Sequence, residues 1–171
     1  GIAVRFGMGA APDSWDALLT AMTHKGYTKQ ELISAGLAVN GKNGRLYDKF
    51  RNRLMLPVID ARGDVIGFTS RVMDDSAPKY LNTPETSVFK KRSVLYGVNY
   101  AKSSKRPNFI LVEGNIDVIT MHQAGFDNTV ATMGTALTED HIRQLGRYTK
   151  ELVLCLDNDA AGMDATQRAI A

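Results

Sequence analysis

Four acidic side chains stand directly after two apolar runs of the sequence. Glu113 ends the first run, and Asp117 follows it by four residues, about one helical turn. Asp157 and Asp159 end the second run, and their spacing of two places both on one side of an extended chain. Carboxylates held close together repel one another unless a cation lies among them, and hard oxygen ligands favour Mg²⁺ or Mn²⁺. The pattern predicts a metal site suited to phosphoryl or nucleotidyl transfer. Considered without the second run, Glu113 fits an ordinary exposed loop between a strand and a helix as well as it fits a metal site.

Other kinds of site find little support in the sequence. The three histidines, His24, His122 and His141, are isolated from one another and from the single cysteine, so no zinc-ligand spacing occurs. The chain has neither a Walker-type loop nor a complete Rossmann glycine signature, which argues against an ATPase or a dehydrogenase. Cys155 lies in an apolar run and is expected to be a small core residue of a reduced protein. No stretch approaches the roughly 20 apolar residues of a membrane span.

The elements expected to position the acids alternate between strand and helix. Strands are predicted at 109–112, 129–131 and 152–156, and helices at 116–124, 138–148 and from 160 onward. Thr138 is expected to cap the middle helix. This order predicts a βαβαβ unit with a parallel sheet and right-handed connections. Because ligands bind beyond the carboxyl ends of such strands, the four acids are expected at one edge of the sheet.

The earlier part of the chain is predicted to begin with two helices. Asp13 is expected to cap the first, with Asp16 as its reciprocal partner, and Gly26 to end it. Trp15 begins the apolar face of this helix and is expected in the core rather than as a base-stacking platform. Thr28 is expected to cap the second helix through a capping box.

Charge divides the sequence unevenly. Residues 1–107 carry 17 Lys and Arg against 9 Asp and Glu, whereas residues 108–171 carry 4 against 9. The segments 54–59 and 65–71 are predicted to form an antiparallel hairpin, followed by a polar loop at 74–84. Positive charge mixed with aromatic residues favours contact with a phosphate backbone, although a solvated loop has a similar composition. The asymmetry indicates a polyanion partner on one side and a cation site on the other.

The acidic stretches, written Glu113-Gly-Asn-Ile-Asp117 and Asp157-Asn-Asp159, resemble the Toprim domain shared by primases, topoisomerases and some nucleases. Other segments resemble DnaG-type bacterial primase, and together they cover nearly the whole chain. These segments are 50–57, 78–86, 95–97 and 131–138.

The resemblance implies an α/β fold in two parts. Residues 1–107 would form the basic α+β N-terminal subdomain of a primase core, with its antiparallel hairpin. Residues 108–171 would form a partial Toprim domain, a Rossmann-like parallel βαβαβ sheet truncated at its C-terminus. The implied activity is metal-dependent, template-directed synthesis of RNA primers on single-stranded DNA from ribonucleoside triphosphates.

The resemblance also implies roles for single residues. Glu113 would be the lead catalytic acid, Asp157 and Asp159 would bind two Mg²⁺ or Mn²⁺ ions with it, and Asp117 would support them. Residues implied to hold template or nucleotide phosphates are Arg71, Lys79, Asn82 and Lys91.

Some parts of the family pattern are expected outside this chain. The chain stops before a further acidic pair, so the isolated chain is expected to be weakly active or inactive. Zinc is expected only in a separate N-terminal module, and a replicative helicase only as the partner of a separate C-terminal module. No membrane partner is expected, and the protein is expected in the cytoplasm at the replication fork. The alternatives are another Toprim enzyme, such as a nuclease or topoisomerase, or an inactive nucleic-acid-binding module.

Overall fold

The computed structural model describes residues 1–157, 162, 163 and 167. The chain divides into two compact units, each described by itself. The first comprises residue 1 with 3–58 and 66–89, and the second comprises residue 2 with 59–65 and 90–171. A short helix, α1 (Ile2–Arg5), begins the chain. Every helix among the described residues is too short or too polar to span a bilayer.

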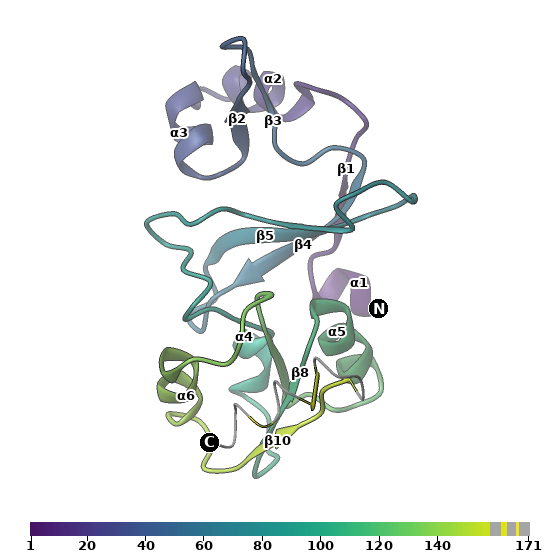
Figure 1. Ribbon diagram of the computed structural model, residues 1–171, viewed down its shortest axis with the longest axis vertical. Helices are drawn as coiled ribbons and strands as arrows, with labels where there is room; N and C mark the ends of the chain where they lie inside the picture. The colour runs from purple at the N-terminus through teal and green to yellow at the C-terminus, as the bar shows by residue number, and fades with distance from the viewer. Residues whose placement is uncertain (158–161, 164–166, 168–171) are drawn as a thin grey trace. The chain divides into compact units, whose positions relative to one another are not determined.

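The first unit is built on a four-stranded sheet in the order β1-β4-β5-β6. Its strands are β1 (Gly9–Ala11), β4 (Arg53–Ile59), β5 (Val65–Val72) and β6 (Tyr80–Asn82). The predicted hairpin is confirmed as β4 and β5, which are neighbours in the sheet (Figure 1). The loop predicted at 74–84 is wrong in part, because β6 lies within it and pairs antiparallel with β5. Backbone pairing along that strand overrides its polar composition.

Two helices and a hairpin complete the first unit. They are α2 (Ala17–His24), α3 (Lys29–Ser34), β2 (Ala38–Asn40) and β3 (Leu46–Asp48). β2 pairs antiparallel with β3, and the helices pack against this hairpin over the buried residues Leu19, Leu32 and Ala38. The capping box at the start of α3 is confirmed, since Thr28 Oγ1 accepts the Glu31 N–H at 3.2 Å.

The start of α2 differs from the prediction. The helix begins at Ala17, and its N-cap residue Asp16 makes no side-chain capping hydrogen bond. The cap comes instead from Asp48 in β3, whose carboxylate accepts the N–H groups of Leu18 and Leu19 at 2.7 and 2.9 Å. The predicted Asp13 cap is therefore wrong. A carboxylate 30 residues away satisfies the donors that a local cap would otherwise satisfy.

Trp15 is not in the core, contrary to the prediction. Because α2 begins two residues after it, the ring does not lie on the apolar face of the helix, and the side chain is 61% exposed. The guanidinium of Arg51 lies 4.2 Å from the ring centroid, and Tyr47 contacts the ring edge-on at 5.4 Å. Trp15 thus forms an exposed aromatic and cation cluster.

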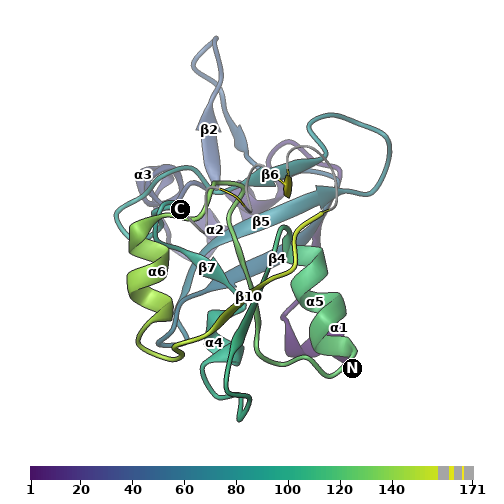
Figure 2. The same ribbon diagram turned by 60° about the horizontal axis from the view of Figure 1, so that its bottom comes forward.

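The second unit contains a sheet in the order β10-β8-β9-β7. The strands β8 (Phe109–Val112), β9 (Thr129–Thr132) and β10 (Leu152–Leu154) run parallel, as predicted. An unpredicted strand, β7 (Leu95–Tyr96), pairs antiparallel with β9. The helices are α4 (Val98–Ala101), α5 (Asn115–Gln123) and α6 (Glu139–Leu145). Figures 1 and 2 show α5 and α6 on opposite sides of β8 and β10.

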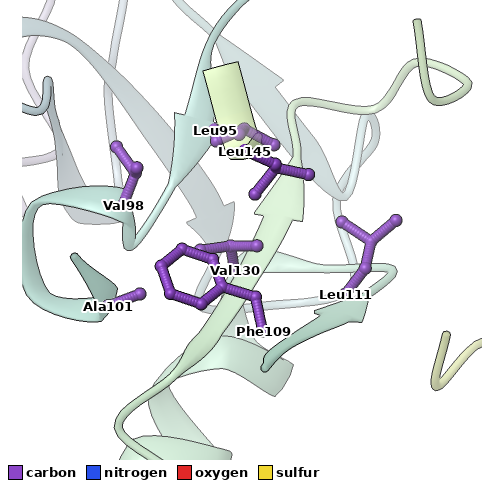
Figure 3. Packing of buried hydrophobic residues seen from close by; sticks show 7 residues of the cluster. All are labelled: Leu95, Val98, Ala101, Phe109, Leu111, Val130 and Leu145. Atoms are coloured by element: carbon purple, nitrogen blue, oxygen red, sulfur yellow. The ribbon is translucent and has the colours of Figure 1, made fainter. Parts of the chain in front are cut away.

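The core of the second unit explains the continuous apolar run of β8. Phe109 and Leu111 of β8 and Val130 of β9 are buried together with residues from β7, α4 and α6 (Figure 3). A strand covered on both faces needs apolar residues at successive positions. Cys155 follows β10 at the edge of the described sheet and is exposed, so its predicted core position is wrong. The helix predicted from residue 160 lies largely outside the described residues.

Candidate metal and nucleic-acid sites

The structure brings together the acids that follow β8 and β10. The two strands are neighbours, and the Cys155 N–H donates to the Leu111 carbonyl at 2.8 Å, which extends their pairing beyond β10. Two residues further, the Asp157 N–H donates to Glu113 Oε1 at 2.9 Å. Glu113 and Asp157 are both exposed at this edge. Their meeting follows from parallel pairing, which places the carboxyl ends of adjacent strands side by side.

Asp117 has a structural role at the start of α5. Its Oδ2 accepts the Gly114 N–H at 3.0 Å, which satisfies one of the donors left open at the helix N-terminus. A carboxylate in the first turn is also stabilised by the positive end of the helix dipole. The support that Asp117 would give to the metal ligands stays a prediction.

The third expected ligand, Asp159, lies outside the described residues. Within residues 1–157 and the three described positions after them, no group of three His, Cys, Asp or Glu could hold a metal ion. The two described acids nevertheless fit a hard divalent cation in kind, since both offer exposed carboxylate oxygens from neighbouring strands. The sequence places a third carboxylate, Asp159, two residues beyond Asp157.

Gly162 lies against both acids. A Cβ at this position would overlap the Asp157 carbonyl oxygen and would lie 3.0 Å from Glu113 Oε1. The backbone of residue 162 therefore approaches the site more closely than any residue with a side chain allows. The available sequence signal for this close approach was a glycine three residues after Asp159.

Three of the predicted phosphate-binding residues lie on β5, β6 and the loop between them. In the register of these strands, Arg71 stands opposite Tyr80, and Asn82 stands opposite Thr69. The Val72 N–H donates to the Lys79 carbonyl at 3.0 Å, so Lys79 is held beside the end of β5. Arg71 and Lys79 line one concave surface, whose other lining residues are Leu54, Val72, Met73, Asp74, Asp75 and Ser76.

Arg53 supports this loop from β4. It is one of the basic residues of the segment 42–53, but only 7% of it is exposed, and burial and the neighbouring Arg51 lower its pKa. Its Nη2 donates to the Pro78 carbonyl at 2.9 Å, directly before Lys79. Arg53 is therefore placed to hold the loop rather than to meet a ligand at the surface. Composition alone could not separate it from exposed basic residues of the same segment, such as Lys42 and Arg45.

Lys91 belongs to the other unit. It lies in the turn Lys90–Ser93, where the Lys90 carbonyl accepts the N–H groups of Ser93 and Val94 at 2.9 and 3.0 Å. The predicted phosphate-binding set is thus divided, with three residues in the first unit and Lys91 in the unit that carries Glu113 and Asp157.

Comparison with known proteins matches two segments of the sequence to two family models. The model described as "DNA primase catalytic core, N-terminal domain" matches residues 1–102, and the model described as "Toprim-like" matches residues 110–171. A curated DNA primase of Clostridium acetobutylicum is 53% identical over 165 residues, which is 96% of this chain and 28% of that protein. The chain thus spans less than a third of the length of this relative.

Solved structures give the same match in three dimensions. The structure described as the Escherichia coli primase catalytic core has a TM-score of 0.92 and 43% identity, covering 99% of this chain and 55% of that one. A DnaG primase catalytic domain bound to single-stranded DNA has a TM-score of 0.91 and 42% identity, with the same coverage. Both matches confirm the mixed α/β fold predicted from the sequence.

Proposed function

Because the chain belongs to the DnaG-type DNA primase family, with a Toprim domain, we propose that it forms part of a catalytic core that makes RNA primers. The template would be single-stranded DNA, and the substrates ribonucleoside triphosphates. The observation that carries the proposal is the contact between Glu113 and Asp157 at the carboxyl edge of the parallel sheet. A related catalytic domain bound to single-stranded DNA supports the choice of template.

In this proposal Glu113 and Asp157 would hold divalent cations, with Asp159 as the third ligand. Bound Mg²⁺ or Mn²⁺ would supply stabilisation of charge on the attacking and leaving oxygens of the transferred nucleotide. The protein's own contribution is geometric. The Asp157 N–H fixes one Glu113 oxygen at 2.9 Å, and the two strands hold both carboxylates at one edge.

The basic residues would bind phosphates. Lys79 is exposed and Arg71 is half-buried on one concave surface, where both cations can meet a nucleic-acid backbone. Asn82 on the neighbouring strand offers an uncharged polar group, and Lys91 a further cation on the second unit. Family membership also supports two wider proposals: action at the replication fork in the bacterial cytoplasm, and a replicative helicase as partner of segments outside this chain.

Substitution of Glu113 tests the proposal directly. Because the chain covers only part of a primase, the assay places it in the C. acetobutylicum relative, in exchange for the corresponding residues. Glu113→Gln keeps the shape of the side chain and removes a charged ligand. We expect primer synthesis to fall about 100-fold or more, which corresponds to about 3 kcal/mol of transition-state stabilisation.

The matched control is Glu139→Gln, which makes the same chemical change at an exposed position in the first turn of α6. Primer synthesis by this variant should stay close to that of the unsubstituted protein. Binding of single-stranded DNA by the Glu113→Gln variant should also persist, which separates loss of chemistry from loss of folding. Near-normal primer yield from Glu113→Gln would disprove the role of Glu113.

A further inference from the structure

The first turn of α6 is tied to the backbone of the turn Lys90–Ser93. His141 Nε2 lies 3.2 Å from the Lys91 carbonyl oxygen, and Thr138 Oγ1 donates to the Arg92 carbonyl at 2.6 Å. The Asp140 carboxylate binds the Arg92 side chain, with Nε and Nη2 at 2.9 and 2.8 Å. These contacts therefore join residues 138, 140 and 141 to residues 91 and 92, which stand 46 to 50 positions earlier in the sequence.

The hydrogen bonds of His141 define its chemical state. The Lys91 carbonyl can only accept, so Nε2 carries a proton. The Thr138 N–H can only donate, and at 3.2 Å from Nδ1 it requires that Nδ1 carry none. The imidazole is therefore neutral with one fixed tautomer. His141 is fully buried, and burial lowers its pKa, which favours the same neutral form.

These contacts fix the backbone directly after the Cα atom of Lys91. The carbonyl of Lys91 is bound by the His141 ring, and that of Arg92 by the Thr138 hydroxyl. The turn then leads into β7, which pairs with β9. A flexible lysine on an ordered backbone loses less conformational freedom when it binds an anion than one on a mobile loop.

We propose that Thr138 and His141 are positioning residues that hold Lys91 for contact with a phosphate of the nucleic acid or nucleotide. The inference rests on the proposed function, because that function gives Lys91 its phosphate. In this arrangement Thr138, the N-cap residue of α6, has two functions. Thr138 closes the N-terminus of α6, by accepting the His141 N–H at 3.2 Å, and also anchors the basic turn.

A matched pair of substitutions at Thr138 tests the proposal. Thr138→Val keeps the shape of the side chain but cannot donate to the Arg92 carbonyl, whereas Thr138→Ser keeps the hydroxyl. Binding of a fluorescein-labelled single-stranded oligodeoxythymidylate to the 171-residue chain is followed by anisotropy at several salt concentrations. We expect Thr138→Val to weaken binding and to lower the steepness of the salt dependence by about 0.7, the value for one single-strand phosphate contact. Thr138→Ser should bind like the unsubstituted chain.

The same measurement with Lys91→Ala separates positioning from a general effect on the fold. If Thr138 acts through Lys91, the double variant Thr138→Val with Lys91→Ala binds no more weakly than Lys91→Ala alone. Additive losses would overturn the proposal, as would unchanged binding by Thr138→Val when Lys91→Ala is impaired. Unchanged binding by Lys91→Ala would instead remove Lys91 from the proposed nucleic-acid surface, and the positioning proposal would fall with it.

Two further measurements guard against a folding defect. Glycine is a tolerable N-cap residue, so Thr138→Gly removes the hydroxyl with little harm to α6 and replaces the valine variant if that variant does not fold. Hydrogen exchange at the Val94 amide, which donates to the Lys90 carbonyl, reports on the turn itself. It should be faster in Thr138→Val than in Thr138→Ser. Equal exchange rates would contradict the anchoring role.

Discussion

At Gly162, two physical effects of an added side chain have opposite signs. Its backbone is helical, and Gly→Ala in a helix usually stabilises by roughly 0.5–1 kcal/mol. The added Cβ, however, would overlap the Asp157 carbonyl oxygen. We expect the overlap to dominate, so that Gly162→Ala lowers the free energy of unfolding by about 1–3 kcal/mol, as measured by urea denaturation.

Gly9→Ala is the control for this substitution. Gly9 lies in β1, and a Cβ there meets no atom within 4 Å. This variant should keep or slightly raise the free energy of unfolding, because alanine restricts the unfolded chain more than glycine does. A stabilised Gly162→Ala variant would show that the close approach to Asp157 does not constrain residue 162.

Single residues also show which contacts sequence patterns can predict and which they cannot. The expected meeting of Glu113 and Asp157 needed only two apolar runs, each ended by an acid, and a parallel sheet. Trp15 was misplaced because helical spacing predicts a buried face only for residues inside the helix, and α2 begins after it. Arg53 could not be recognised as buried, because its contact with the Pro78 carbonyl joins positions 25 residues apart.

Asp48 of β3 stabilises the start of α2. It is 2% exposed and accepts two N–H groups from the first turn of α2, so its removal leaves one buried and one half-buried donor unsatisfied. We expect Asp48→Ala to lower the free energy of unfolding by about 2–3 kcal/mol, within the range for a lost cap plus unsatisfied buried groups. Urea denaturation followed by circular dichroism measures the change.

Asp16→Ala is the matched control, because Asp16 occupies the N-cap position but makes no side-chain capping bond. Its removal should change the free energy of unfolding by no more than about 0.5 kcal/mol, as for an ordinary surface residue. A larger loss from Asp16→Ala than from Asp48→Ala would show that Asp16, rather than Asp48, stabilises the start of α2.

The elements differ in how far the sequence determines them. The apolar runs 109–112 and 152–154 were predicted as strands because both faces of a buried parallel strand need apolar residues. β8 is buried in this way, whereas β10 lies at the edge of the described sheet and leaves Val153 exposed. Short strands such as β6 and β7 were not predicted, because two or three residues carry no periodicity, and only their partners β5 and β9 make them strands. The start of α2 was missed for the same reason, since its cap comes from β3.

Charge looks different when it is counted by compact unit rather than by sequence halves. The first unit carries 10 Lys and Arg against 7 Asp and Glu, and the second carries 11 of each. The basic residues from Lys90 to Arg106 belong to the unit with the acidic edge. The simple division into a basic half and an acidic half therefore does not describe the folded chain. Each unit instead offers cations for a polyanion.

Since both units carry cations, we expect both to contribute to the binding of single-stranded DNA. Lys79 and Lys91 lie in different units, and the proposed function assigns each a phosphate contact. Each lost contact should lower the steepness of the salt dependence of single-strand binding by about 0.7, so Lys79→Ala with Lys91→Ala should lower it by about 1.4. A fall near 0.7 would mean that only one of the two lysines meets a phosphate.

The control must make the same change in net charge elsewhere. Lys25→Ala with Lys29→Ala removes two exposed lysines near α2 and α3, outside the proposed surface. If only the overall charge of the chain attracted DNA, both double variants would weaken binding equally. If Lys79 and Lys91 contact phosphates directly, the salt dependence of binding becomes less steep when both are replaced by alanine. It stays as steep as in the unsubstituted chain when Lys25 and Lys29 are replaced. Equal slopes in the two double variants would remove Lys79 and Lys91 from the nucleic-acid surface.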